Sequence, residues 1–460
     1  MSSVVFLALI VLSLALALWS RSGRGKQSMH DFFIASRQFG VGLVFFLAAG
    51  EIYSIGTMVG FPGGIYAKGP TYGFWFLGYI LLAYPVGYFL GPRIWKAGQV
   101  HNAITLPDLF KGHFGSRVLE VLVAASAILF LLPWGELQFT GLVAALRGLG
   151  WNFPPLALVS LAAVLAFSYI AISGVRASAF VAVLKDVLMV VAIVVTGIAV
   201  ASESGWSHVY AVASQHVSNR MNGHQIAFSM STMLFQSLGF YMMPFGVQSF
   251  FTARSASTIR RSQVFMPLYM LMYPFLVVAA YFALSANLHL ASPNEAFFAA
   301  AVRLLPPWLL GLVAAGASLS GLLVLAGISL AIGPMVTRNL LPGLAESRQK
   351  AGAKLVIVLY LLVSIVLTLF SPKLMLTLIN TAYYGITQFF PGMMVILFSL
   401  RVRASAVAMG LFSGQLLAIV LYLSAPDLGG INLGLVCLAV NIAVAALCNM
   451  LPRPRPATAS

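Results

Sequence analysis

Long apolar stretches alternate with short polar gaps along the whole chain. A bilayer crossing by a helix needs about twenty predominantly apolar residues. By that measure, thirteen segments qualify as membrane-spanning helices. They lie near 3–20, 40–64, 72–95, 117–145, 155–173, 179–201, 227–253, 263–286, 307–336, 353–371, 374–400, 403–425 and 431–451. The pattern therefore predicts an all-α membrane protein with about 13 transmembrane helices, embedded in the lipid bilayer.

The basic residues are sorted onto alternate gaps between these segments, and this sorting predicts the topology. Of 26 Lys and Arg, 20 fall in the gaps after the odd-numbered segments or at the C-terminus, and Lys185 lies within a segment. The other five are Lys68, Arg147, Arg220, Arg303 and Lys373. Since basic loops stay in the cytoplasm, the N-terminus is predicted outside and the C-terminus inside, in the cytoplasmic (inner) membrane of a bacterium.

Composition excludes several classes of protein. With 60% hydrophobic and 8% charged residues, a soluble globule of this length could not cover its surface with polar groups. The net charge of +16 is spread over seven short loops, so no nucleic-acid partner is expected. No metal-ligand spacing, nucleophile motif or phosphate loop is present, so we expect no enzyme activity and no cofactor.

Two segments contain residues that break helices. The second, at 40–64, carries Gly50, Gly56, Gly60 and Pro62, and the seventh, at 227–253, carries Gly239, Pro244 and Gly246. Broken membrane helices leave backbone groups without partners, which is tolerated only where protein, water or a ligand supplies them. Because the two breaks lie five segments apart in opposite orientation, they indicate an inverted-repeat transporter with a binding site near the bilayer midplane.

Several stretches resemble the sodium:solute symporter family, relatives of the sodium–glucose transporters with a LeuT-like fold. They are DFFIASRQFG at 31–40, GFPGGIYAKGPTYGF at 60–74, TLPDLFKGHFGSRVLE at 105–120, SGVRASAF at 173–180, PMVTRNLL at 334–341 and QFFPGMM at 388–394. The stretch beginning at 173 is most similar to the monocarboxylate-permease branch. The resemblance implies a LeuT-like 5+5 inverted repeat with broken second and seventh helices. It divides the chain into a first peripheral helix and loop (1–30), two five-helix repeats (31–201 and 202–400) and two peripheral helices with a tail (401–460).

Two ionisable residues lie deep in the predicted membrane region. Glu51 is about eleven residues into its segment, roughly 16 Å by helical rise, and Lys185 lies at a comparable depth in the sixth segment. Such residues are candidates for a function, because burying an unpaired charge in the membrane costs free energy. They form either a pair that only fixes helix packing or a pair that exchanges a proton during transport. Asp186 points about 100° away from Lys185 along the helix and is expected to pair locally.

The family resemblance also implies an ion site. The positions that match the family's sodium ligands are Gly50, Tyr53, Ala315, Ser318 and Leu319. Leu319 stands where the family commonly has Ser or Thr, and Val181-Ala182 replaces a frequent Thr-Asp pair. In sodium-independent relatives with this fold, an ammonium on the equivalent helix occupies the sodium position, a role open to Lys185. Sodium, proton and uncoupled transport stay open, with proton or uncoupled transport ranked slightly above sodium.

The family's substrate pocket lies between the two breaks. The matching candidates are Thr57, Gln236, Tyr241, Tyr384 and Gln388, with Phe61 and Tyr383 as gates. Helix N-termini at a break attract an anion, which favours a small carboxylate over a sugar. Other charged residues are expected at interfaces or in solvent: Glu136 near the outer end of its segment, and Asp108, Lys111, Arg117 and Glu120 in a cytoplasmic cluster.

These features predict a secondary transporter that imports a small organic acid, a monocarboxylate, by alternating access. Two alternatives stay open. One is a sodium-coupled amino-acid symporter, and the other is a transport-derived membrane sensor that binds a solute without appreciable flux.

Overall fold

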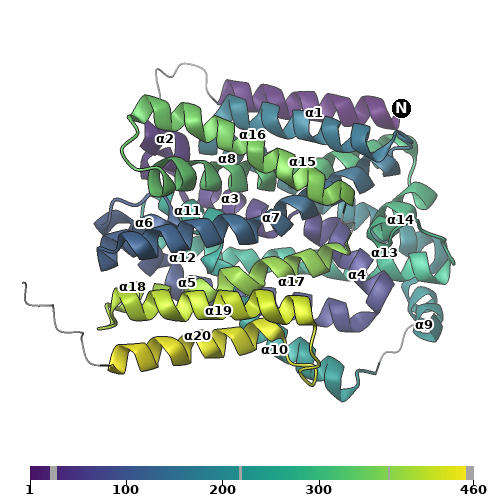
Figure 1. The fold of residues 1–460 in the computed structure, drawn as a ribbon. Coiled ribbons are helices and arrows are strands. Elements are labelled where there is room, and N and C mark those ends of the chain that lie inside the picture. Colours follow the sequence, from purple (N-terminus) through teal and green to yellow (C-terminus); the bar gives the residue numbers. More distant parts are fainter. Residues whose placement is uncertain (21–27, 217–219, 371–372, 452–460) are drawn as a thin grey trace, which may run out of the picture.

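The computed structural model describes residues 1–20, 28–216, 220–370 and 373–451. Helices make up this part of the chain, which has no β-strand and a single isolated bridge between Phe39 and Ala253. Most helices run roughly along one direction, with α1 at one edge of the bundle and α19 and α20 at the opposite edge (Figure 1). A helix satisfies its own backbone groups, so it is the structure expected of such an apolar chain. The prediction of an all-α membrane fold is confirmed.

The first broken helix is formed by α3, η2 and α4. The elements up to the middle of the chain are α1 (Ser2–Trp19), α2 (Met29–Ile34), η1 (Ala35–Arg37), α3 (Val41–Ile52), η2 (Gly56–Gly60), α4 (Phe61–Lys68), α5 (Pro70–Val100), α6 (Leu106–Phe114), α7 (Arg117–Gly148), α8 (Pro155–Ser204) and α9 (Trp206–His216). After Ile52, Tyr53 leaves the helical conformation (φ −93°, ψ 80°), and the chain resumes as a short π-helix. The break predicted within 40–64 is therefore present.

Gly174 lies at a kink that divides α8 into two helical parts. Its φ of 51° lies in the left-handed region, where glycine has no steric penalty. A Cβ there would lie 2.8 Å from the carbonyl oxygen of Phe32, so no larger residue fits. The two predicted segments 155–173 and 179–201 meet at this kink.

The second broken helix is formed by α10, η3 and α11. The remaining elements are α10 (Gly223–Gly239), η3 (Phe240–Met242), α11 (Pro244–Phe251), α12 (Ala256–Phe265), η4 (Met266–Met272), α13 (Tyr273–Ser285), η5 (Pro293–Glu295), α14 (Ala296–Leu304), α15 (Pro307–Pro334), η6 (Met335–Leu340), α16 (Glu346–Phe370), α17 (Met375–Ile386), η7 (Thr387–Phe389), α18 (Phe390–Phe398), α19 (Ala404–Ser424) and α20 (Leu433–Met450). The chain bends by 48° before Pro244, which cannot donate a helical hydrogen bond. The break predicted within 227–253 is also present.

Nine helices in the described ranges are long and apolar enough to cross a membrane, or ten if the bent pair at Pro244 counts as one crossing. The first half of α8 and the piece Val41–Gly50 are apolar but shorter. The count of thirteen therefore stays a prediction, as do the repeat boundaries.

α15 is the central scaffold of the bundle. Its most apolar window is 89% buried, and it packs against α8, α7 and α1. Small residues allow the close contact with α8: a Cβ on Gly316 would lie 3.1 Å from the backbone of Leu188. This packing holds α8 and α15 beside the first broken helix, where the candidate ion site lies.

Candidate functional site

The ammonium of Lys185 contacts the break in the first broken helix. Lys185 on α8 is fully buried. Its Nζ donates to the carbonyl oxygen of Tyr53 at 2.7 Å and lies 3.4 Å from that of Gly50. Both carbonyls belong to the last turn of α3 and its end, where the helix no longer supplies partners. Lys185 therefore fills part of the hydrogen-bonding capacity that the break leaves free.

Asp186 is a counter-ion of this ammonium. Its Oδ1 lies 2.5 Å from Lys185 Nζ, and its Oδ2 accepts a hydrogen bond from Tyr269 at 2.8 Å. Tyr269 in turn stacks on Tyr53, with ring centroids 4.5 Å apart. The expectation that Asp186 points away from Lys185 is corrected, because both side chains turn toward the space between α8 and η4. Lys185, Asp186, Tyr269 and Tyr53 form a closed ring of contacts.

The proposed partnership of Lys185 with Glu51 falls outside the described side chains, since only the backbone of Glu51 is described. That pairing stays a prediction.

The candidate ligands on α15 are all buried. Ala315, Ser318 and Leu319 lie on the scaffold helix, and the hydroxyl of Ser318 has no hydrogen-bond partner within the described ranges. Leu323, one turn beyond Leu319, packs directly on the first broken helix: a Cβ on Gly50 would lie 2.9 Å from its Cδ2. On this face of α15, an apolar side chain approaches Gly50.

A cavity lies between the two breaks. Its empty volume is about 470 Å³, including the part open to solvent. It is lined by Ala48, Ile52, Tyr79, Trp134, Phe240, Tyr241, Met243, Phe245, Gly246, Ser249, Phe250 and Tyr383. Two of the predicted substrate residues, Tyr241 and Tyr383, belong to this wall. We call it the central cavity.

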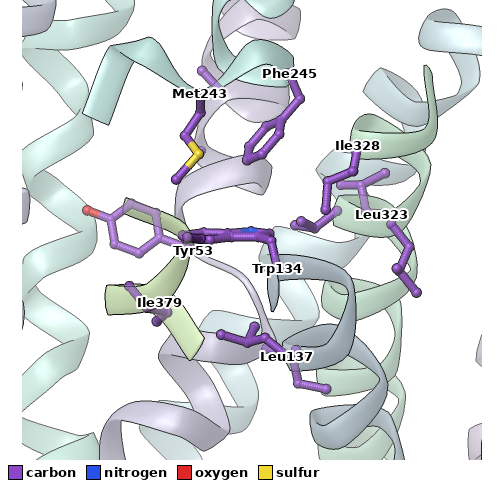
Figure 2. Close-up of a cluster of buried hydrophobic side chains, with 14 of the residues drawn as sticks. Tyr53, Trp134, Leu137, Met243, Phe245, Leu323, Ile328 and Ile379 are labelled. Carbon is purple, nitrogen blue, oxygen red and sulfur yellow. The ribbon is translucent and has the colours of Figure 1, made fainter. Parts of the chain in front are cut away.

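Trp134 of the central cavity was missed by sequence reasoning. Its ring lies between Met243 and Phe245 on one side and Leu137 and Ile379 on the other (Figure 2). It meets Tyr383 edge-on at 5.8 Å, and its Nε1 is buried without a partner in the described part of the chain. The signal in the sequence is the pair Pro133-Trp134 within an apolar segment, two residues before Glu136.

Three more predicted residues are buried close to the breaks. Thr57 lies in η2, and Phe61 meets Tyr273 edge-on at 5.0 Å. Gln236 on α10 donates to Asn380 on α17 at 2.6 Å. These residues join the broken helices to their neighbours, and their part in substrate binding stays a prediction.

Tyr384 and Gln388 lie on the side of α17 and η7 that contacts α20. The Gln388 amide donates to the Tyr384 carbonyl at 3.1 Å, and its Oε1 lies 3.2 Å from Asn441 Nδ2. Neither residue lines the central cavity. Their assignment to substrate is thus left to a binding experiment.

In the predicted solvated charge cluster, the basic side chains of Lys111 and Arg117 are exposed as expected, but the two carboxylates are buried. Glu120 is fully buried and Asp108 nearly so. Asn339 in η6 donates to both carboxylates, at 2.8 Å to Glu120 and 2.7 Å to Asp108. Arg117 and Arg338 complete the ion pairs at 2.7 and 3.1 Å. The prediction was wrong for the carboxylates because helix ends that contact one another shield them from water. The network joins α6 and α7 to η6.

Comparison with known proteins shows the fold class and the family of this chain. The fold is that of a LeuT-like transporter: the substrate-bound, outward-open structure of a Na⁺-coupled sialic acid symporter superposes with a TM-score of 0.80 at 16% identity, covering 97% of this chain and 98% of the other. The model of the sodium:solute symporter family matches residues 32–418, and the chain belongs to that family.

Two curated relatives match over nearly their whole length. The monocarboxylate transport permease protein of Rhizobium johnstonii is 27% identical, with 99% of this chain and 97% of the relative covered. The uncharacterized symporter YhjB of Bacillus subtilis is 26% identical, with 100% and 99% covered.

Proposed function

We propose that this protein is a sodium-independent member of its family that imports a small monocarboxylate by alternating access. The observation that carries the proposal is the contact of Lys185 Nζ with the carbonyl oxygens of Tyr53 and Gly50. In the family resemblance, these two carbonyls are sodium ligands.

The chemistry of the donors supports this substitution. A hard cation binds through several oxygen ligands. Here two candidate carbonyls already accept from, or lie beside, an ammonium, and Leu319 offers no side-chain oxygen. The ammonium of Lys185 donates to these carbonyls in place of an ion, so the oxygens at the break have a partner without sodium.

The proposed substrate class rests on the central cavity and on the relatives. The cavity is mainly aromatic and apolar, and its lining residues with hydroxyl groups are Tyr241, Tyr383, Tyr79 and Ser249. The hydroxyls of Tyr241 and Ser249 already donate to Gln263 and to the Gly246 carbonyl. It borders the N-terminus of α11, where free backbone N–H groups favour an anion. A curated relative over the full chain is named a monocarboxylate transport permease. A small carboxylate with a short apolar body suits such a site.

Replacing sodium is the direct test. In proteoliposomes, uptake of radiolabelled pyruvate or lactate is expected to change by no more than about twofold when potassium or choline replaces sodium, because a ligand with no differential affinity shifts no equilibrium. Labelled alanine is measured in parallel. A strict sodium requirement, or sodium-dependent uptake of alanine alone, would contradict the proposal and favour the amino-acid symporter.

The proposed orientation places the N-terminus outside and the C-terminus in the cytoplasm, from the charge sorting. A reporter active only in the cytoplasm is expected to report when fused after Ser460 and to stay silent when fused before Met1. Fusions in the loops 149–154, between α7 and α8, and 341–345, between η6 and α16, serve as outer and inner controls. Two active terminal fusions would rule out an odd number of crossings.

A further inference from the structure

Glu136 is a buried carboxyl that the proposed function leaves unexplained. It lies near the middle of α7, 12 residues before Gly148, about 18 Å along the helix. The residue is 4% exposed, and its Oε1 has no hydrogen-bond partner in the ranges that the structure describes. The expectation of an interfacial residue is therefore corrected. Burying a carboxylate without a partner is costly, so its retention suggests a function.

Glu136 faces an apolar groove distinct from the central cavity. The groove has an empty volume of about 950 Å³, including its open part, and is walled by α7, α16, α17 and α19. The ionisable groups that share it are Lys373, Tyr384 and Tyr422. Lys373 donates to the Tyr422 hydroxyl at 2.9 Å. From α16, Tyr360 packs beside Gly135 and donates to the backbone of Leu131. Among the described residues that line this groove, Lys373 is thus the one cation.

The helices α7 and α17 separate the groove from the central cavity. Trp134 and Tyr383 face the cavity, whereas Glu136 and Tyr384 face the groove. The two helices are in close contact, since a Cβ on Gly385 of α17 would lie 1.9 Å from the ring of Phe130 on α7. A charge on Glu136 therefore acts on the helix pair that also forms a wall of the central cavity.

We propose that Glu136 is a proton-binding site that couples proton uptake to the packing of α7 against α17. One proton adds to the carboxylate to give the neutral acid, and no other bond changes. The neutral acid is compatible with the apolar groove. The carboxylate instead attracts Lys373 or water toward α7, and this loosens the packing of α7 against α17. This inference rests on the proposed sodium-independent function and names the site of the coupling proton.

Proton binding can be measured without any substrate. Infrared difference spectra of the purified protein between neutral and mildly acidic pH are expected to show a protonated-carboxyl band that is lost in Glu136→Gln. Glu136→Asp should keep a shifted band, and Glu203→Gln, at an exposed carboxyl on the end of α8, should leave the wild-type band unchanged. An identical band in wild type and Glu136→Gln would overturn the assignment.

Coupling is tested by separating accumulation from exchange. In sodium-free proteoliposomes with an inward proton gradient, Glu136→Gln is expected to lose accumulation of labelled pyruvate while keeping pyruvate–pyruvate exchange. Exchange is retained because a permanently neutral side chain still permits the loaded carrier to turn over. Gradient-driven accumulation by Glu136→Gln would overturn the inference alone. Strictly sodium-dependent uptake by the wild type would instead overturn the proposed function, whatever the infrared result.

Discussion

Lys185→Ala is expected to abolish uptake and to destabilise the protein. The substitution removes the ammonium from the carbonyls of Tyr53 and Gly50 and leaves Asp186 buried without its cation. Breaking a buried ion pair by removing one partner costs about 3–5 kcal/mol. Thermal unfolding of the purified variant, together with pyruvate uptake in proteoliposomes, measures the two effects separately.

A second substitution identifies the counter-ion. If Asp186 is the main partner, Lys185→Ala with Asp186→Asn should recover much of the lost stability, because no charge is left stranded. Lys185→Ala with Glu51→Gln serves as the matched comparison, since it neutralises the other candidate. Uptake should remain absent in both double variants. Normal, strictly sodium-dependent transport by Lys185→Ala would contradict the proposed role of Lys185 and indicate an ordinary sodium symporter.

The elements of this fold were largely predictable because their causes are local. Apolar length predicts the helices, and Gly and Pro within apolar segments predict the breaks at Tyr53 and Pro244. The kink at Gly174 was harder to foresee. It depends on the approach of the Phe32 carbonyl, a contact between segments far apart in sequence.

The site was less predictable because it depends on where long side chains reach. Helical spacing placed Asp186 on a different face from Lys185, yet their side chains meet 2.5 Å apart. The backbone angle between two neighbours does not fix the positions of flexible side-chain ends. Likewise, the burial of Glu120 depends on Asn339, more than 200 residues away. Sequence patterns indicate that such residues are unusual, but not which partner each one has.

The central cavity also differs from the substrate pocket that the family resemblance implies. Tyr241 and Tyr383 line it, but Gln388 turns its amide toward Asn441 and Tyr384. Trp134 lines the cavity instead, and it lies on α7, which packs against α17. The two broken helices set the place of the cavity, whereas its wall depends on packing between α7 and α17.

Tyr383→Ala is expected to weaken ligand binding at least about tenfold, or about 1.4 kcal/mol. The ring fills the cavity wall between Trp134 and Tyr79, at 5.8 and 5.7 Å, so its loss removes contact area and admits water. Thermal-shift titration with pyruvate and lactate measures the affinity, and Tyr383→Phe, which keeps the ring, is the control. Unchanged affinity in Tyr383→Ala would place the substrate outside this cavity.

Thr57→Ala and Gln388→Ala extend the test to the pocket inferred from the family. If both residues reach the substrate, each variant should bind pyruvate or lactate more weakly while expressing normally. If Gln388 only joins η7 to α20, its variant should unfold at a lower temperature with the affinity unchanged, because the lost hydrogen bonds to Tyr384 and Asn441 are structural. Wild-type affinity in both variants would show that the substrate contacts lie elsewhere, with the wall of Trp134 and Tyr383 as the next place to substitute.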